Sequence, residues 1–478
     1  MFYQRIFCYG TLAGMTDSCH GFCAEAGTSF PIDRGLFQRA GSSSSAKSGR
    51  DALRIELPLQ TIRAMVAARV HTDHFGRIPD LLAGRFQRLC IEPSATLLLI
   101  VLEDALNSGV SFRTRGVEQY NALDQRIIAV SYTHRSTMRD TAELVCGVQL
   151  RCAGHILRST YGEPDFAHPT IVGGTRMLFS GDLGAPHAML LSAGRPLYGA
   201  DSLVSESTYD GRQCANRLTR RQRLKNVSDQ ALEDNGTVFI SAFSIGHAHE
   251  SPYQAIVRRP RTTPAESVGR GLGSSTRAFL LDINWRELLM SRRFTVPYRQ
   301  LQPPWNKELP RSVKLGRRPL GFERLILVNS YSDHTCMVQQ MARTARPAIV
   351  IAGNGMCSSG RIVNYLKAML GDSRHNVLFV GYQAAGTPGR AIQTFGPQGG
   401  YVDLEGERLN IKAGVSSIGG YSAHADQDGL VRFVTGIRRK PSHIRIVHGE
   451  QKAKQALAER LDAFYQGKQQ ALQLTIPQ

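Results

Sequence analysis

The stretch Arg69-Val70-His71-Thr72-Asp73-His74 decides the fold of this chain, and it follows an apolar, strand-like run at residues 64–68. It has the form of a metal-binding loop, H-x-H-x-D-H, in which arginine replaces the first histidine. The two imidazoles and the carboxylate can converge on divalent ions, because neutral imidazole and carboxylate both suit zinc. Arg69 cannot join them, since a guanidinium has no acceptor and stays protonated. The loop therefore predicts a zinc site with one altered position.

The chain carries a large surplus of positive charge. Its 478 residues include 58 Lys and Arg against 39 Asp and Glu, which gives a formal net charge of +19 and a pI near 9.8. A surplus of this size favours a polyanionic partner through phosphate neutralisation and counterion release. A generally basic surface would produce the same number, so the charge favours nucleic acid without showing it.

Length predicts the number of domains, and the cysteines and apolar runs indicate the cellular compartment of the protein. The length predicts about two or three domains. The 9 cysteines form no C-x-x-C pair, which suits a reducing compartment. The chain begins without an apolar signal core, and its longest apolar runs, such as residues 97–102, are too short to cross a bilayer. We therefore expect a cytoplasmic protein with no membrane partner.

Short apolar runs alternate with helical stretches, which predicts an α/β fold. Each predicted strand is followed by a polar or glycine-containing turn, the place where ligands and catalytic groups gather at the carboxyl ends of strands. The clearest predicted strands are at residues 176–180, 237–240, 278–281, 347–351, 376–380 and 443–447. Helical periodicity is clearest at residues 451–465, where Ala453, Leu457, Leu461 and Phe464 share a face.

Four further segments supply polar residues of the same kind. His155 follows a strand-like run, and Asp182 lies just past a strand end in Ser180-Gly181-Asp182. His424 and His448 come late in the chain, in the segments S-A-H-A-D and V-H-G-E. Each one alone is a weak signal, because a lone histidine is more often a hydrogen-bonded structural residue than a ligand. Together they repeat one arrangement, a strand followed by a polar turn, and predict a single metal site.

The loop Gly353–Arg361 lies between a predicted strand and a predicted helix. A dinucleotide fingerprint G-x-G-x-x-G does not fit, because the next glycine after Gly355 is Gly360. A phosphate cradle at the amino end of the helix fits better. Its candidate members are Asn354, Gly355, Ser358, Ser359 and Arg361. A tight strand-to-helix turn with no ligand remains the alternative.

In this order the motifs resemble those of the metallo-β-lactamase-fold hydrolases of the β-CASP branch, the bacterial RNA-processing ribonucleases related to the cleavage and polyadenylation endonuclease. The resemblance covers nearly the whole chain. It runs through Pro31–Gln38, the 69–74 loop, A-G-H-I-L, S-G-D-L-G, Glu206-Ser207-Thr208-Tyr209, Ile351–Met356, Gly381-Tyr382-Gln383 with Gly386-Thr387, S-A-H-A-D and V-H-G-E. It implies a four-layer αββα metallo-β-lactamase domain, formed by residues 1–212 and 414–478, with an α/β β-CASP domain inserted at 213–413.

The resemblance also implies which residues hold metal. Two zinc ions are expected, and Asp182 would bridge them. Asp33 would lie behind the site rather than bind metal. The first ion would be held by residue 69, His71, His155 and Asp182, and the second by Asp73, His74, Asp182 and His448.

The implied activity is zinc-dependent hydrolysis of phosphodiester bonds in RNA. Asp73, His424 and Glu206 form the expected catalytic set. His424 would protonate the departing oxygen, and Glu206 would orient its imidazole. The loop at 353–361 would face the RNA backbone. Relatives of this type often self-associate, so a homo-oligomer is also expected.

Arg69 departs from the family pattern and leaves three outcomes open. The chain binds one zinc at the second site, or it binds both ions weakly, or it is a catalytically weak or silent RNA-binding relative. Retention of Glu206, His424 and His448 favours the enzyme, because binding alone does not need them. A small-molecule hydrolase, such as a thioesterase or lactamase, would share the metal loop, but the charge of +19 and the β-CASP motifs argue against it.

Overall fold

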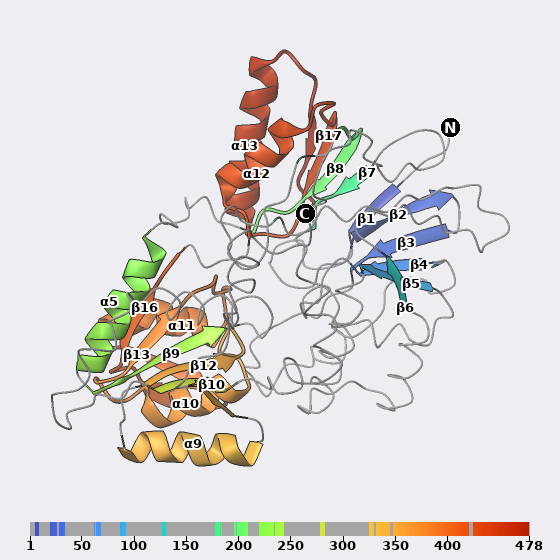
Figure 1. The fold of residues 1–478 in the computed structure, drawn as a ribbon. Coiled ribbons are helices and arrows are strands. Elements are labelled where there is room, and N and C mark those ends of the chain that lie inside the picture. Colours follow the sequence, from blue (N-terminus) through green and yellow to red (C-terminus); the bar gives the residue numbers. More distant parts are fainter. Residues whose placement is uncertain are drawn as a thin grey trace, which may run out of the picture.

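The computed structural model describes the residues at 5–8, 20–25, 28–33, 62, 64–67, 87–91, 127–130, 177–181, 183, 196, 198–208, 219–233, 235–242, 278–282, 325–328, 331–344, 348–419 and 424–477. Within these residues the fold is α/β, as predicted, and most strands belong to three sheets (Figure 1). We call them the N-terminal, the C-terminal and the central sheet.

The N-terminal sheet has the order β1-β2-β3-β4-β5-β6. Its first three strands pair antiparallel, and β3 to β6 pair parallel. The strand β4 is the run predicted ahead of the 69–74 loop, and Asp33 follows β3 with 3% of its surface exposed. The strands are β1 (Arg5–Cys8), β2 (His20–Glu25), β3 (Thr28–Ile32), β4 (Ala64–Ala67), β5 (Gln87–Ile91) and β6 (Ile127–Val130).

The C-terminal sheet has the order β18-β17-β8-β7, and its described pairs are all parallel. Two helices, α12 (Gln427–Gly436) and α13 (Gln451–Gly467), pack against it through a shared apolar cluster that includes Leu203, Ile444 and Leu461. Figure 1 shows both helices on one side of these strands. The strands are β7 (Met177–Phe179), β8 (Ser202–Ser205), β17 (His443–Ile446) and β18 (Gln473–Thr475).

The helix α13 confirms most of its predicted apolar face. Ala453, Leu457 and Leu461 are buried, as the 3.6-residue period requires. Phe464 is only partly buried, and its neighbour Tyr465 fills the core instead. The Tyr465 hydroxyl donates to the carbonyl of residue 441 at 3.0 Å, which satisfies its polar end inside the core. Burial raises the pKa of Tyr465 to about 12.

The central sheet has the order β11-β10-β12-β9-β13-β16 and is parallel throughout its described pairs. Its middle strands are continuous apolar runs because helices cover both faces of such sheets. The strands are β9 (Thr237–Ala242), β10 (Ala278–Asp282), β11 (Leu325–Leu327), β12 (Ala348–Gly353), β13 (Asn376–Phe379) and β16 (Gly414–Ser417). The described helices beside it are α5 (Arg220–Glu233), α9 (Tyr331–Thr344), α10 (Arg361–Met369) and α11 (Pro388–Phe395).

Local sequence explains where two of the connections turn. Thr387 caps α11 by accepting the N–H of Arg390 at 3.3 Å, and Pro388 occupies the first helical position, where a missing N–H costs nothing. After the short 3-10 turn η5 (Gly396–Gln398) comes a hairpin of β14 (Tyr401–Leu404) and β15 (Glu407–Asn410). Its two turn residues, Glu405 and Gly406, both have positive φ, which matches the strand twist of a tight hairpin.

The six strands predicted most clearly from the sequence are confirmed as β7, β9, β10, β12, β13 and β17. The strand β16 belongs to the central sheet and begins at residue 414, directly after the predicted domain limit at 413. Among the helices of the described ranges, none has both the length and the apolar character needed to cross a bilayer.

Candidate active site

The site is built at the carboxyl edge of the C-terminal sheet. Because β7, β8 and β17 run parallel, the residues that follow them meet at one edge. These residues are Ser180 after β7, Glu206 after β8 and His448 after β17. Glu206 is 2% exposed and His448 is 8% exposed, so the edge buries ionisable side chains. Buried polar groups of this kind need partners, and the partners define the site.

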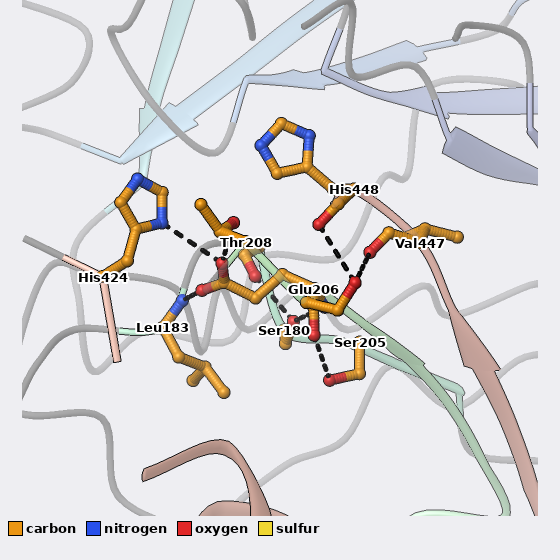
Figure 2. A network of polar contacts seen from close by, with 10 residues as sticks. Ser180, Leu183, Ser205, Glu206, Thr208, His424, Val447 and His448 are labelled. Carbon is orange, nitrogen blue, oxygen red and sulfur yellow. Dashed lines mark hydrogen bonds and ion pairs between the residues drawn. The ribbon is translucent and has the colours of Figure 1, made fainter. Parts of the chain in front are cut away.

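Glu206 is the centre of a hydrogen-bond network (Figure 2). One carboxylate oxygen accepts the main-chain N–H of Leu183. The other accepts the Thr208 hydroxyl and lies 3.1 Å from Nδ1 of His424. An ionised carboxylate offers only acceptors, so this arrangement places a proton on Nδ1 of His424. The bond also fixes the orientation of the imidazole.

Main-chain bonds hold His424 opposite Glu206. The next residue, Ala425, donates its N–H to the carbonyl of Leu183 at 2.7 Å. Asp426 caps α12 by accepting the N–H of Gly429 at 2.8 Å, so the chain enters the helix in a fixed direction. Leu183 therefore binds Glu206 through its N–H and the His424 segment through its carbonyl. This clamp holds the chain immediately after Asp182.

His448 has a left-handed backbone, with φ of 50°, which is uncommon for a residue that carries a side chain. Ser207 supports this conformation. Its N–H donates to the His448 carbonyl at 2.9 Å, and its hydroxyl donates to the Val447 carbonyl at 3.1 Å. A strained backbone of this kind costs on the order of 1 kcal/mol and persists where the surroundings over-determine it. The turn after β17 is therefore fixed by the residues that follow β8.

His448 is the one predicted metal ligand that lies among the described residues. Its imidazole is buried at a strand end beside the Glu206 network, and it is a donor type that zinc prefers (Figure 2). The position and chemistry of His448 therefore fit a zinc ligand. Arg69 and the remaining predicted ligands, His71, Asp73, His74, His155 and Asp182, lie outside the described residues.

The predicted phosphate loop lies where the sequence placed it, between β12 and α10. Asn354 organises it with a φ of 82°. Its Oδ1 accepts the N–H groups of Met356 and Ser358 at 3.2 and 3.3 Å, and its Nδ2 donates to the Ser359 hydroxyl at 2.8 Å. Arg361 donates to the carbonyl of Val328 at 3.0 Å. The polar side chains thus shape the loop, and phosphate binding by this loop stays a prediction.

Three contacts of the site were not assigned from the sequence. Thr208 and the N–H of Leu183 hold Glu206, and the Tyr382 hydroxyl donates to the carboxylate of Glu450. A hydroxyl two residues after the glutamate was a usable signal for Thr208, because it can reach back to the carboxylate. A main-chain donor carries no sequence signal, and neither does a bond between residues 68 positions apart.

Comparison with protein families agrees with this arrangement. The family model described as "Beta-Casp domain" matches residues 288–392. The model described as "Zn-dependent metallo-hydrolase RNA specificity domain" matches residues 408–470, which include His424 and His448. The first match includes β11, β12 and β13 of the central sheet, and the second includes β16 of that sheet and β17 of the C-terminal sheet.

Relatives with curated names extend the likeness to the whole chain. Ribonuclease TTHA0252 of Thermus thermophilus is 28% identical over 96% of this chain and 96% of its own length. An RNase J-like protein of Methanocaldococcus jannaschii is 25% identical over 82% of each chain. Transcription termination factor FttA of Methanosarcina mazei is 25% identical over 83% of this chain but only 60% of its own length.

The site places the buried carboxylate of Glu206 and the part-buried imidazole of His424 beside the turn that carries His448. The two family matches and the named relatives support a β-CASP metallo-β-lactamase RNA hydrolase.

Proposed function

We propose that this chain is a zinc-dependent ribonuclease that hydrolyses phosphodiester bonds in RNA. The observation that carries the proposal is the bond between Nδ1 of His424 and the buried carboxylate of Glu206, at the strand edge that also bears His448. A structural role alone does not explain why this edge buries the Glu206 carboxylate, because an apolar side chain would avoid the cost of desolvation. A proton donor beside a metal-binding turn is what hydrolysis of a phosphodiester requires.

Zinc would be held by His71, Asp73, His74, His155, Asp182 and His448, with Asp182 shared between two ions. When bound, zinc supplies a nucleophile from water at neutral pH and neutralises charge on the phosphate. Asp73 serves in the same proposal as a ligand and as a member of the catalytic set.

His424 would act as the general acid. Its Nε2 proton passes to the departing oxygen as the P–O bond breaks, and the imidazole is left neutral with its remaining proton on Nδ1. Glu206 keeps that proton on Nδ1 and stabilises the charged imidazolium before transfer. Thr208 and the N–H of Leu183 hold the Glu206 carboxylate still, so the imidazole presents Nε2 in one orientation.

RNA would reach the site along a basic surface. The net charge of +19 supports phosphate contacts, and the loop with Asn354, Gly355, Ser358, Ser359 and Arg361 would bind the backbone. The finer architecture is part of the proposal: a four-layer αββα domain from residues 1–212 and 414–478, a β-CASP insertion at 213–413, and self-association. A cytoplasmic location is supported by the absence of C-x-x-C pairs among the 9 cysteines.

Arg69 favours a second candidate, a relative that binds RNA and cleaves it weakly or not at all. A fixed guanidinium stands where the first ion would take an imidazole, so that ion would bind less tightly. The variant Arg69→His separates the two candidates. If it gains a second equivalent of zinc together with a large increase in cleavage, the natural chain has a weakened first site and works with about one ion.

The proposal is tested by zinc content per chain, from elemental analysis, measured beside cleavage of a labelled single-stranded RNA. We expect about one or two zinc ions per chain, and cleavage that a chelator abolishes and added zinc restores. Tight RNA binding by protein that takes up no zinc and cleaves nothing would overturn the enzyme and leave the RNA-binding relative.

A further inference from the structure

The turn after β13 connects the central sheet to the C-terminal sheet. Gly381-Tyr382-Gln383 leaves the central sheet, and the Tyr382 hydroxyl donates to the carboxylate of Glu450, in the turn after β17. Tyr382 belongs to the segment matched by the Beta-Casp domain model, and Glu450 belongs to the segment matched by the RNA specificity domain model. The bond therefore connects the carboxyl edges of the central and C-terminal sheets, the edges that carry the described site residues.

Close packing and main-chain hydrogen bonds fix the backbone between Glu450 and the predicted metal ligand His448. Glu450 lies two residues after His448 and precedes α13, yet its side chain does not cap that helix. The residue between them, Gly449, packs so closely that a Cβ there would lie 2.3 Å from the Ser207 carbonyl oxygen. Ser207 also holds the His448 carbonyl, so a displacement of Glu450 moves the turn that carries His448.

Hydrogen bonds and close packing also connect the turn that carries Tyr382 to the predicted phosphate loop. The next residue, Gln383, is 2% exposed, and its Nε2 donates to the carbonyl of Gly355 at 2.8 Å. Gly389 donates its N–H to the carbonyl of Met356 at 3.0 Å. A Cβ at Gly389 would lie 1.8 Å from Oε1 of Gln383, so α11 closes over this side chain. These contacts therefore connect the Tyr382 turn to the 354–361 loop.

We propose that Tyr382 is a positioning residue that couples the 354–361 loop to the His448 turn. Its bond to Glu450 fixes the distance between the segment that would hold RNA phosphates and the segment that would hold zinc. This inference rests on the proposed function, because it assigns the coupling to RNA cleavage. The bond is charge-assisted and half-buried, so its loss costs more than the loss of an exposed neutral bond.

The test compares Tyr382→Phe, Glu450→Gln and the double variant in steady-state cleavage of a labelled single-stranded RNA with zinc present. We expect each single variant to lower kcat by about tenfold with little change in KM, because alignment is lost while binding surfaces remain. The double variant should be no slower than either single one, since one bond is removed only once. The control Tyr401→Phe, on the half-exposed β14–β15 hairpin, should keep the wild-type rate. Additive losses in the double variant would overturn the coupling.

A second readout does not depend on activity. Amide hydrogen exchange of Tyr382→Phe should become faster in peptides covering 381–384 and in peptides covering 448–454, while strand β9 stays as in the wild type. Unchanged exchange in either turn would overturn the coupling even if cleavage were slower. A wild-type protein that cleaves no RNA but shows this paired change would overturn the proposed function and keep the mechanical coupling.

Discussion

The central and C-terminal sheets are both parallel, yet their carboxyl edges are built differently. In the C-terminal sheet, β8 runs directly into Glu206, Ser207 and Thr208, each of them at most 2% exposed. In the central sheet, β12 and β13 run into Asn354 and Tyr382, which are partly exposed. The apolar cluster of the central sheet, which includes Phe239 and Tyr365, lies beneath this more open edge.

Under the proposed function, this difference corresponds to different roles for the two sheets. A buried carboxylate at a strand end is stable only if every donor around it is placed correctly, so the C-terminal edge is over-determined and suited to chemistry. The central sheet takes its stability from packing and leaves its edge accessible, which suits contact with a large substrate. Tyr382 and Glu450 join the two edges.

The largest expected effect on stability is in the central core. Phe239 is fully buried and lies with its ring 6.0 Å from that of Tyr365. Phe239→Ala should lower the free energy of unfolding by about 3–5 kcal/mol, measured by urea denaturation, because it removes transfer energy and leaves a cavity. The matched control Phe395→Ala, at a side chain that is 48% exposed, should change it far less. Equal losses at the two positions would contradict the assignment of the core.

The next largest effect is expected from removing the hydrogen bonds of Glu206 at the carboxyl edge of the C-terminal sheet. Glu206→Ala removes the acceptor of Leu183, Thr208 and His424 and should lower the free energy of unfolding by about 2–3 kcal/mol. Glu206→Gln should cost less, because one oxygen still accepts a bond. Denaturation of both variants, with RNA cleavage measured on the folded protein, checks this order. A Glu206→Ala protein with wild-type stability would show that the network does not hold the edge.

A third effect depends on pH and belongs to the central sheet. Burial lowers the pKa of His375 below its ordinary value of 6.5, and its Nδ1 accepts the N–H of Thr237 at 3.1 Å. The unfolded chain therefore binds the proton more readily, so the stability from neutral His375 is complete above about pH 6.5 and is lost as pH falls below it. Unfolding measured at pH 7.5 and pH 5 should show a smaller decline in His375→Gln than in the wild type. An equal decline in the free energy of unfolding in both proteins would contradict the assignment of this pH dependence to His375.

The smallest effect is at an exposed ion pair, in contrast with the buried carboxylate of Glu206. A side-chain bond from Arg374 lowers the pKa of Asp372 to about 2. Its contribution to stability is complete above the ordinary value of 3.8 and is lost as pH falls towards 2. Since the Asp372 side chain is 35% exposed, Asp372→Asn should cost less than about 1 kcal/mol at neutral pH by urea denaturation. If Asp372→Asn lowered the free energy of unfolding as much as Glu206→Ala does, the expected difference between an exposed ion pair and the Glu206 network would be contradicted.

Much of the fold followed from the sequence because strands that end in polar turns are local patterns. The apolar runs that became β7, β9, β10, β12, β13 and β17 needed no knowledge of their partners. The polar turns also predicted that His424 and His448 belong to one site, and the family resemblance added Glu206 to it. The structure brings His424 and Glu206, which are 218 positions apart, into contact, and their roles in a site stay a prediction.

The remaining contacts could not be read from the sequence because they depend on main-chain positions and on packing between distant segments. The N–H of Leu183 is chemically like any other, and only the fold brings it to Glu206. The left-handed backbone of His448 arises from Ser207, which no local propensity predicts. The bond between Tyr382 and Glu450 requires the two sheets to be in place first.

The central claim is that the hydrogen-bonded pair of His424 and Glu206 carries cleavage. It is tested most directly by the kcat of His424→Ala on labelled single-stranded RNA, with zinc per chain measured in the same samples. We expect kcat to fall by about 10²–10⁴-fold while zinc content and RNA affinity stay unchanged, because a general acid contributes at this scale. The exposed His443 provides the control, and His443→Ala should cleave as the wild type does. Wild-type cleavage by His424→Ala with its zinc intact would contradict the account.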